Sequence, residues 1–147
     1  MNYSIAIPSH KRSDIIKDKV LKLLEKHSIN KEQIYIFVEE KEIEEYKNKL
    51  PEYQIVKGGE GIAGQRIAIS NYFEQNHFIV SIDDDVSDVL DHSKSIISLD
   101  IFIKDAFYLL IDNNEFFTKD TITTDLRFCI GQFKIIINKK QLEDRHY

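Results

Sequence analysis

The chain has 147 residues, a formal net charge of −5 and an apolar fraction of 42%. This length fits one domain with a substantial core, and the acidic balance argues against strong non-specific binding of nucleic acid. No apolar run approaches the length of a membrane span, and the single cysteine excludes an internal disulfide. We therefore expect a single-domain cytoplasmic protein.

Strands and helices alternate in the first half of the chain. Apolar runs and helical spacing predict strands at 3–7, 33–38, 53–56 and 78–82, and helices at 15–27, 40–49 and 62–75. We expect Ser13 or Asp14 to cap the first helix. The third helix is predicted to turn Ile62, Ile69, Tyr72 and Phe73 inward. Such alternation indicates a parallel sheet covered by helices, with right-handed crossovers.

The second half of the chain has a different pattern. An amphipathic helix is predicted at 98–111 with Ser98 as its cap, and two strand-like runs follow at 121–130 and 133–138. The pair Gly131 and Gln132 between these runs suits a tight hairpin. A helix followed by a hairpin predicts that the sheet is mixed.

Three consecutive carboxylates follow the buried strand predicted at 78–82. In extended backbone Asp83 and Asp85 share one face, whereas Asp84 points away. Two carboxylates that face one spot repel each other unless a cation lies between them. Their oxygen atoms suit Mg²⁺ or Mn²⁺, and the ends of parallel strands are where ligands bind in α/β sheets. The alternative interpretation is an acidic turn that faces water.

Basic and glycine-rich segments are expected near these carboxylates. The loop Pro8, Ser9, His10, Lys11 and Arg12 follows the first strand, and Glu39 and Glu40 follow the second. A glycine-rich loop at 58–61 opens the third helix, with Gln65 and Arg66 in its first turns. Free backbone N–H groups at a helix start bind anions. Carboxylates beside an anion site suit a nucleotide diphosphate bridged by a metal ion.

Three segments, 5–12, 61–66 and 79–85, together resemble the N-terminal half of GT-A fold glycosyltransferases. The third segment is similar to the Asp-x-Asp motif of that family. Within the family, the chain is most similar to the TET/JBP-associated glycosyltransferases, which are predicted to act on modified DNA bases, and to related phage and large-virus enzymes. The resemblance covers 2–86 and extends more weakly over 124–138. It implies a Rossmann-like, mostly parallel sheet flanked by helices.

The resemblance also implies roles for individual residues. Pro8, Ser9, His10 and Arg12 would border the nucleotide, Glu39 would lie near its base or ribose, and Gly61, Gln65 and Arg66 would face the diphosphate. Asp83 would approach the ribose or the metal, Asp85 would coordinate the metal, and Asp84 would act through water. Family members often have an asparagine after the arginine that corresponds to Arg66, whereas this chain has Ile67.

The acceptor side carries less information. Residues 1–86 are expected to bind the nucleotide-sugar donor, and 87–147 to form a short acceptor side. Glu143 and Asp144 are the candidates for the base that deprotonates the acceptor, with a charged tail as the alternative. The acceptor would be a modified DNA base or a glycan. Because a full family member continues further, we expect self-association or a longer polypeptide to complete the acceptor side.

Two other functions fit the same pattern. A sugar nucleotidyltransferase would use similar carboxylates and metal, but that class usually has a glycine-rich signature after the first strand, which Ser9–Arg12 lacks. A non-catalytic module that binds a nucleotide or a sugar is the second alternative. Turnover, as opposed to binding alone, would distinguish this module from an enzyme.

Overall fold

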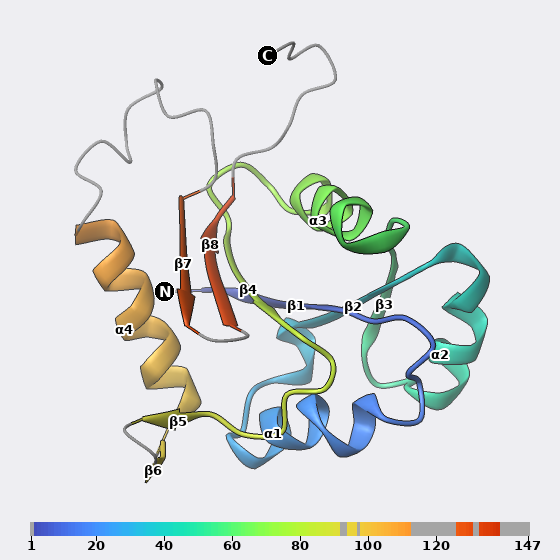
Figure 1. The fold of residues 1–147 in the computed structure, drawn as a ribbon, viewed down its shortest axis with the longest axis horizontal. Helices are drawn as coiled ribbons and strands as arrows, with labels where there is room; N and C mark the ends of the chain where they lie inside the picture. Colours follow the sequence, from blue (N-terminus) through green and yellow to red (C-terminus); the bar gives the residue numbers. More distant parts are fainter. Residues whose placement is uncertain (1, 92–93, 97, 113–125, 131–132, 139–147) are drawn as a thin grey trace, which may run out of the picture.

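The computed structural model describes residues 2–91, 94–96, 98–112, 126–130 and 133–138 (Figure 1). The main sheet contains β1 (Ser4–Pro8), β2 (Ile34–Val38), β3 (Gln54–Lys57), β4 (Phe78–Ile82), β7 (Leu126–Ile130) and β8 (Phe133–Ile137), and a small pair contains β5 (Leu90–Asp91) and β6 (Lys94–Ser95). The α-helices are α1 (Val20–Lys26), α2 (Ile43–Lys49), α3 (Gly61–Tyr72) and α4 (Leu99–Asp112). Short 3₁₀ turns occupy Ile16–Asp18, Lys31–Gln33 and Glu40–Glu42.

The strand order of the main sheet is β3-β2-β1-β4-β8-β7. Strands β1 to β4 are parallel to one another, while β8 runs antiparallel to β4, and β7 antiparallel to β8. This order confirms the predicted mixed α/β sheet and the antiparallel pairing of the last two strands. The predicted turn at Gly131 and Gln132 lies outside the described residues. The chain winds from β1 to β3 in one direction and returns to place β4 on the other side of β1. The switch point of the sheet therefore lies between β1 and β4.

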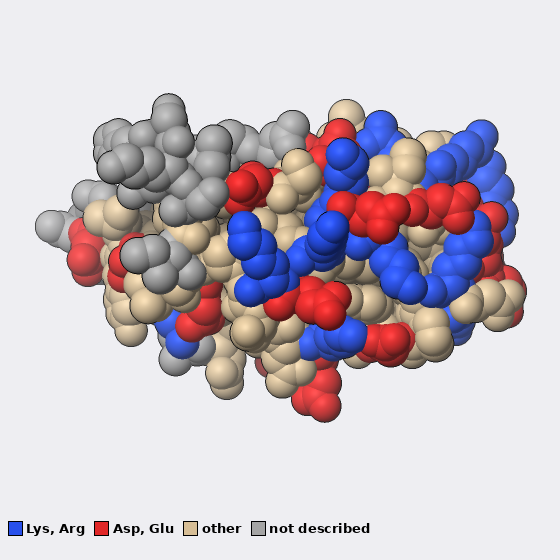
Figure 2. Space-filling view, turned by 90° about the horizontal axis from the view of Figure 1, so that it is seen from below, with Lys and Arg blue, Asp and Glu red and all other residues tan. Residues whose placement is uncertain are grey.

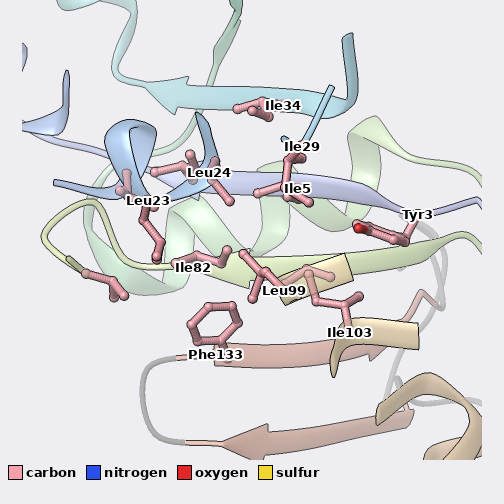
Figure 3. Packing of buried hydrophobic residues seen from close by; sticks show 14 of the residues in the cluster. Tyr3, Ile5, Leu23, Leu24, Ile29, Ile34, Ile82, Leu99, Ile103 and Phe133 are labelled. Carbon is pink, nitrogen blue, oxygen red and sulfur yellow. The ribbon is translucent and has the colours of Figure 1, made fainter. Parts of the chain in front are cut away.

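Helices cover both faces of the sheet (Figure 1). On one face, residues of α1, α2 and α4 pack against the strands in the larger core cluster. Figure 3 shows Leu23 and Leu24 of α1 and Leu99 and Ile103 of α4 in the same cluster as Ile82 of β4. On the other face a smaller cluster joins α3 to the strands through Ala6, Phe37, Ile69, Phe73, Ile79 and Ile136. The apolar residues that recur at helical spacing in the sequence thus pack against one face of the sheet or the other.

The first predicted helix is interrupted. A 3₁₀ turn precedes α1, and Lys19 between them has φ −113° and ψ −100°, outside helical geometry. The predicted caps are wrong, because neither Ser13 nor Asp14 bonds to this helix. Ser13 Oγ donates to Glu45 Oε2 at 2.9 Å, and Asp14 accepts from Lys49 Nζ at 2.7 Å. Side chains of α2 therefore engage the two groups that could have capped α1.

The third helix starts and ends close to its predicted positions but buries fewer residues than expected. Ile69 and Phe73 are buried as predicted. Ile62 is 83% exposed and Tyr72 is 50% exposed, so the prediction that they face inward is wrong. Ile62 lies in the first turn of α3, and its side chain borders a cleft instead of packing in the core.

The fourth helix is capped as predicted and is tied to the rest of the fold at its start. Ser98 Oγ accepts a hydrogen bond from the backbone N–H of Ile101 at 3.3 Å. His27 Nδ1 accepts from the N–H of Leu99 at 3.3 Å, and Tyr3 donates to Asp100 at 2.6 Å.

In the described part of the chain, no helix has the length and apolar composition needed to cross a bilayer. Acidic and basic side chains are interspersed on the face that carries α1 (Figure 2).

Candidate functional site

A cleft of about 630 Å³ lies at the switch point, where the first loop and the acidic turn follow β1 and β4. One wall comes from the start of α3, and the floor comes from β4 and β8. The cleft is lined by all the residues predicted to bind donor or metal: Pro8, Ser9, His10, Arg12, Glu39, Gly61, Gln65, Arg66, Asp83, Asp84 and Asp85. Segments that are 72 to 75 residues apart in sequence are thus brought together, because the carboxyl ends of parallel strands meet at one edge.

Asp84 fixes the acidic turn to the loop after β1. Asp84 is 7% exposed, and its carboxylate accepts hydrogen bonds from Ser9 Oγ at 2.8 Å and from Arg12 Nη1 at 3.0 Å. Because Ser9 donates to Asp84, the Tyr46 hydroxyl donates to Ser9 over 2.7 Å and accepts the Arg12 backbone N–H at 3.1 Å. Asp84 therefore contacts the first loop directly, and the water-mediated role that was expected of it stays a prediction.

Asp83 and Asp85 are more exposed than Asp84, and they differ in whether a positively charged side chain pairs with them. Asp85 pairs with Arg12 at 3.3 Å. The Asp83 side chain has no ion pair or hydrogen bond within the described chain. Burial raises its pKa, Lys134 and Arg12 oppose this increase, and Asp85 and Asp84 add to it. Arg12 is shared between two carboxylates, and its pKa is raised, mainly by Asp84. The unpaired carboxylate of Asp83 would accept a cation.

The donor atoms of this turn fit a hard divalent cation that also binds a phosphate. Asp83, Asp84 and Asp85 do not gather three oxygen atoms within 4.8 Å of one another in the described structure. They do not form a complete cage. Mg²⁺, however, is usually held by one or two carboxylates together with substrate phosphates and water. Asp83 and Asp85 are the two carboxylates that would hold such an ion.

Positive charge approaches the cleft from two further elements. Arg66, in the second turn of α3, lines the cleft and makes no ion pair with another described residue. Lys134 of β8 also lines it, and sequence reasoning missed this residue. The helix α3 begins at Gly61, whose φ of +67° favours glycine. Its first N–H groups therefore add a partial positive charge to the same wall.

Gln65 has a structural contact that the sequence did not indicate. It is 8% exposed, and its Nε2 donates to the backbone carbonyl of Phe37 at 3.0 Å, which ties α3 to β2. The side chain passes under the glycine-rich loop: a Cβ on Gly58 would lie 2.0 Å from Gln65 Oε1. The glycine thus makes room for this anchor.

His10 and Glu39 meet a residue that was not predicted to belong to the site. His10 Nδ1 lies 3.0 Å from Glu42 Oε2 and 3.5 Å from Glu39 Oε1. Glu42 is buried in the 3₁₀ turn after β2 and also accepts the Lys11 N–H at 2.6 Å. The 3₁₀ turn places Glu42 against the first loop, whereas the sequence predicted that this residue belongs to a charged helix exposed to solvent.

The lining of the cleft also comprises residues that were not predicted to belong to the site. They are Gly59, Ile62, Ile69, Ser70, Ile79, Ser81, Ile136 and Asn138, in addition to Lys134. The alternation of Lys134, Ile136 and Asn138 along one strand could have placed these three on a common face. Asn138 is buried, and its Nδ2 donates to the carbonyls of Ser70 and Glu74 at 2.9 Å, which fixes β8 to the end of α3. Glu143 and Asp144 lie outside the described residues, so their role stays a prediction.

No protein-family model matches the sequence, and no curated protein matches it at a significant level. Among solved structures, the chain is similar to a 4-diphosphocytidyl-2C-methyl-D-erythritol synthase, with 12% identity, a TM-score of 0.43 and coverage of 95% of this chain and 68% of the other. It is also similar to the 2-C-methyl-D-erythritol 4-phosphate cytidylyltransferase of Francisella tularensis, with 10% identity, a TM-score of 0.42 and coverage of 99% and 68%. At these values the likeness assigns neither a family nor an activity, and membership of the TET/JBP-associated branch stays a prediction.

Proposed function

We propose that this chain is the catalytic domain of a metal-dependent glycosyltransferase whose donor is a nucleotide sugar. The observation that carries the proposal is the convergence of Asp83 and Asp85 with Arg12 and Arg66 in one cleft at the switch point. A nucleotide diphosphate needs a cation held by carboxylates and additional positive charge. The cleft volume of about 630 Å³ also lies within the range of small-molecule sites.

The diphosphate would lie between the acidic turn and the start of α3. Asp83 and Asp85 would hold Mg²⁺ or Mn²⁺, which when bound would act as a Lewis acid that neutralises the departing diphosphate. Arg66 would approach the diphosphate from α3, and the N–H groups of the first helical turn would contribute further. Arg12 is held beside the turn by Asp84 at 3.0 Å, so its guanidinium is already oriented when the donor arrives.

The sugar would extend along the floor formed by β4 and β8. Ile79 and Ile136, which are almost fully buried, form the apolar base of this floor, and Ser81 and Lys134 add polar groups to it. Sugars present both hydroxyl groups and an apolar ring face, so a mixed floor suits them. Glu143 and Asp144 remain the proposed source of the acceptor base, and the proposed acceptor is a glycan or a modified DNA base.

A paired assay tests this proposal. The chain would be incubated with Mn²⁺ and each of several nucleotide sugars, with simple glycans or hydroxymethylated DNA as acceptor, and nucleotide release would be measured beside glycoside formation. We expect metal-dependent release together with transfer, reduced by roughly a hundredfold or more in Asp85→Asn. Pyrophosphate release from a nucleoside triphosphate and a sugar phosphate would indicate nucleotidyl transfer instead. Binding without any turnover would indicate a non-catalytic module.

A further inference from the structure

Three side chains at the rim of the cleft form a cluster separate from the acidic turn. His10 comes from the loop after β1, and Glu39 and Glu42 come from the turn after β2. The His10 Nδ1 atom and one oxygen of each glutamate lie within 4.8 Å of one another. His10 Nδ1 is 3.0 Å from the Glu42 oxygen and 3.5 Å from the Glu39 oxygen.

The two separations from His10 Nδ1, 3.0 and 3.5 Å, lie on either side of the spacing expected for ligands around a transition-metal ion. Zinc–nitrogen and zinc–oxygen bonds of about 2.0–2.1 Å place tetrahedral ligand atoms about 3.3 Å apart. An imidazole nitrogen combined with two carboxylates favours Zn²⁺ and related ions over Mg²⁺, which prefers oxygen ligands alone.

Groups outside the cluster orient both glutamates toward His10. The Glu42 side chain is only 9% exposed, and its Oε1 accepts the backbone N–H of Lys11 at 2.6 Å, so Oε2 is left to face His10. Glu39 likewise offers Oε2 to Lys41 Nζ at 3.4 Å and Oε1 to His10. Each carboxylate therefore has one oxygen engaged by an outside partner and one directed to the common point. Outside partners of this kind typically fix the ligands of metal sites.

We propose that His10, Glu39 and Glu42 bind Zn²⁺, at a site distinct from Asp83 and Asp85. Three protein ligands leave a fourth position for water or a substrate group, and His10 and Glu39 both line the cleft. The loop after β1 serves both sites, since Ser9 and Arg12 contact Asp84 while His10 and Lys11 contact Glu42. The proposal does not depend on glycosyl transfer.

The test is calorimetric titration of the full chain with ZnCl₂, without nucleotide, in a buffer that does not chelate metals. We expect one saturable site whose Kd rises at least tenfold in His10→Ala and in Glu42→Gln. Asp85→Asn should change this Kd less than twofold, and so should Glu40→Gln, because Glu40 is a neighbouring carboxylate paired with Lys57. Thermal unfolding without metal checks that each variant is folded. His10 is half exposed, so its replacement leaves the core intact.

Histidine nitrogen NMR gives a second readout that places the ion. Zn²⁺ should shift the Nδ1 resonance of His10 and leave those of His27 and His77 unchanged. Two results would overturn the proposal: absence of saturable Zn²⁺ binding, or binding that survives His10→Ala and is lost in Asp85→Asn. Failure here would leave the nucleotide-sugar proposal standing, because that proposal is tested with Mn²⁺ and a donor.

Discussion

Asp83 has an acidic side chain at the cleft without a protein partner in the described chain. Burial and the neighbouring carboxylates raise its pKa, so folding disfavours its ionised form. The group contributes stability fully below the unfolded-state pKa, and this contribution is lost as pH rises through the raised folded-state pKa. At neutral pH without a cation, Asp83 therefore opposes folding.

Asp83→Asn removes the ionisable group and with it the charge that opposes folding. We expect the variant to gain stability over the wild type as pH rises from below 3.8 through the raised pKa. Urea unfolding across that range, without added metal, measures the difference. Addition of Mn²⁺ at neutral pH should reduce this difference in the free energy of unfolding, because the ion neutralises the carboxylate that only the wild type has. A difference that does not change with pH would show that ionisation of Asp83 does not oppose folding.

Arg66 tests the anion-binding wall. Arg66→Ala should weaken nucleotide-sugar binding at least tenfold, and Arg66→Lys should weaken it less but measurably, because lysine keeps the charge and loses the planar fork. Lys22→Ala, an exposed cation of α1, is the matched control. Affinity that is equal in the wild type and Arg66→Ala would remove this residue from the site.

At the scale of elements, a hydroxyl of α2 supports the first loop. Tyr46 donates to Ser9 and accepts the Arg12 N–H, so Tyr46→Phe leaves two polar groups without this partner. We expect the free energy of unfolding to fall by about 1–2 kcal/mol. Tyr108→Phe, at an exposed position of α4, should change it by less than about 0.5 kcal/mol. Equal effects of the two substitutions in urea unfolding would contradict the role of the network.

The glycines before α3 have different constraints. A Cβ on Gly59 would lie 2.3 Å from the backbone oxygen of Gly64, so Gly59→Ala must displace the loop or the helix. A Cβ on Gly61 would meet open space, and only the φ of +67° opposes it, at a cost of about 1–2 kcal/mol. We therefore expect Gly59→Ala to lower the melting temperature more than Gly61→Ala. The reverse order in thermal unfolding would show that the close approach to Gly64 is relieved cheaply.

For the whole molecule, the sequence predicted the parallel half of the sheet and the convergence of the first loop, the acidic turn and the start of α3. Each of those strands is a local apolar run, and the end of a parallel strand places the next residues at a known edge. The Asp83–Asp85 turn and the loop with Arg12 could therefore be assigned to one site from sequence alone.

The missed features depend on contacts between distant segments. Lys134 enters the cleft because β8 pairs antiparallel with β4, in the register Ser81 with Lys134, and no local pattern specifies that pairing. Ser13 and Asp14 do not cap α1 as predicted, because they bond to side chains of α2. The sequence predicted Glu42 as part of a helix exposed to solvent, whereas in the structure its 3₁₀ turn packs against the first loop. Tertiary contacts overrode local preference in each case.

Coupled binding of donor and metal tests the central claim most directly. Calorimetry would measure the Kd of nucleotide sugars such as UDP-glucose and GDP-mannose with Mn²⁺ and with a chelator, in the wild type, in Asp85→Asn and in the exposed control Asp105→Asn. We predict that at least one donor binds the wild type and Asp105→Asn tenfold or more tightly with Mn²⁺, and that Asp85→Asn loses this difference. A donor affinity that is independent of Mn²⁺, or unchanged in Asp85→Asn, would contradict a metal-bridged nucleotide sugar in this cleft.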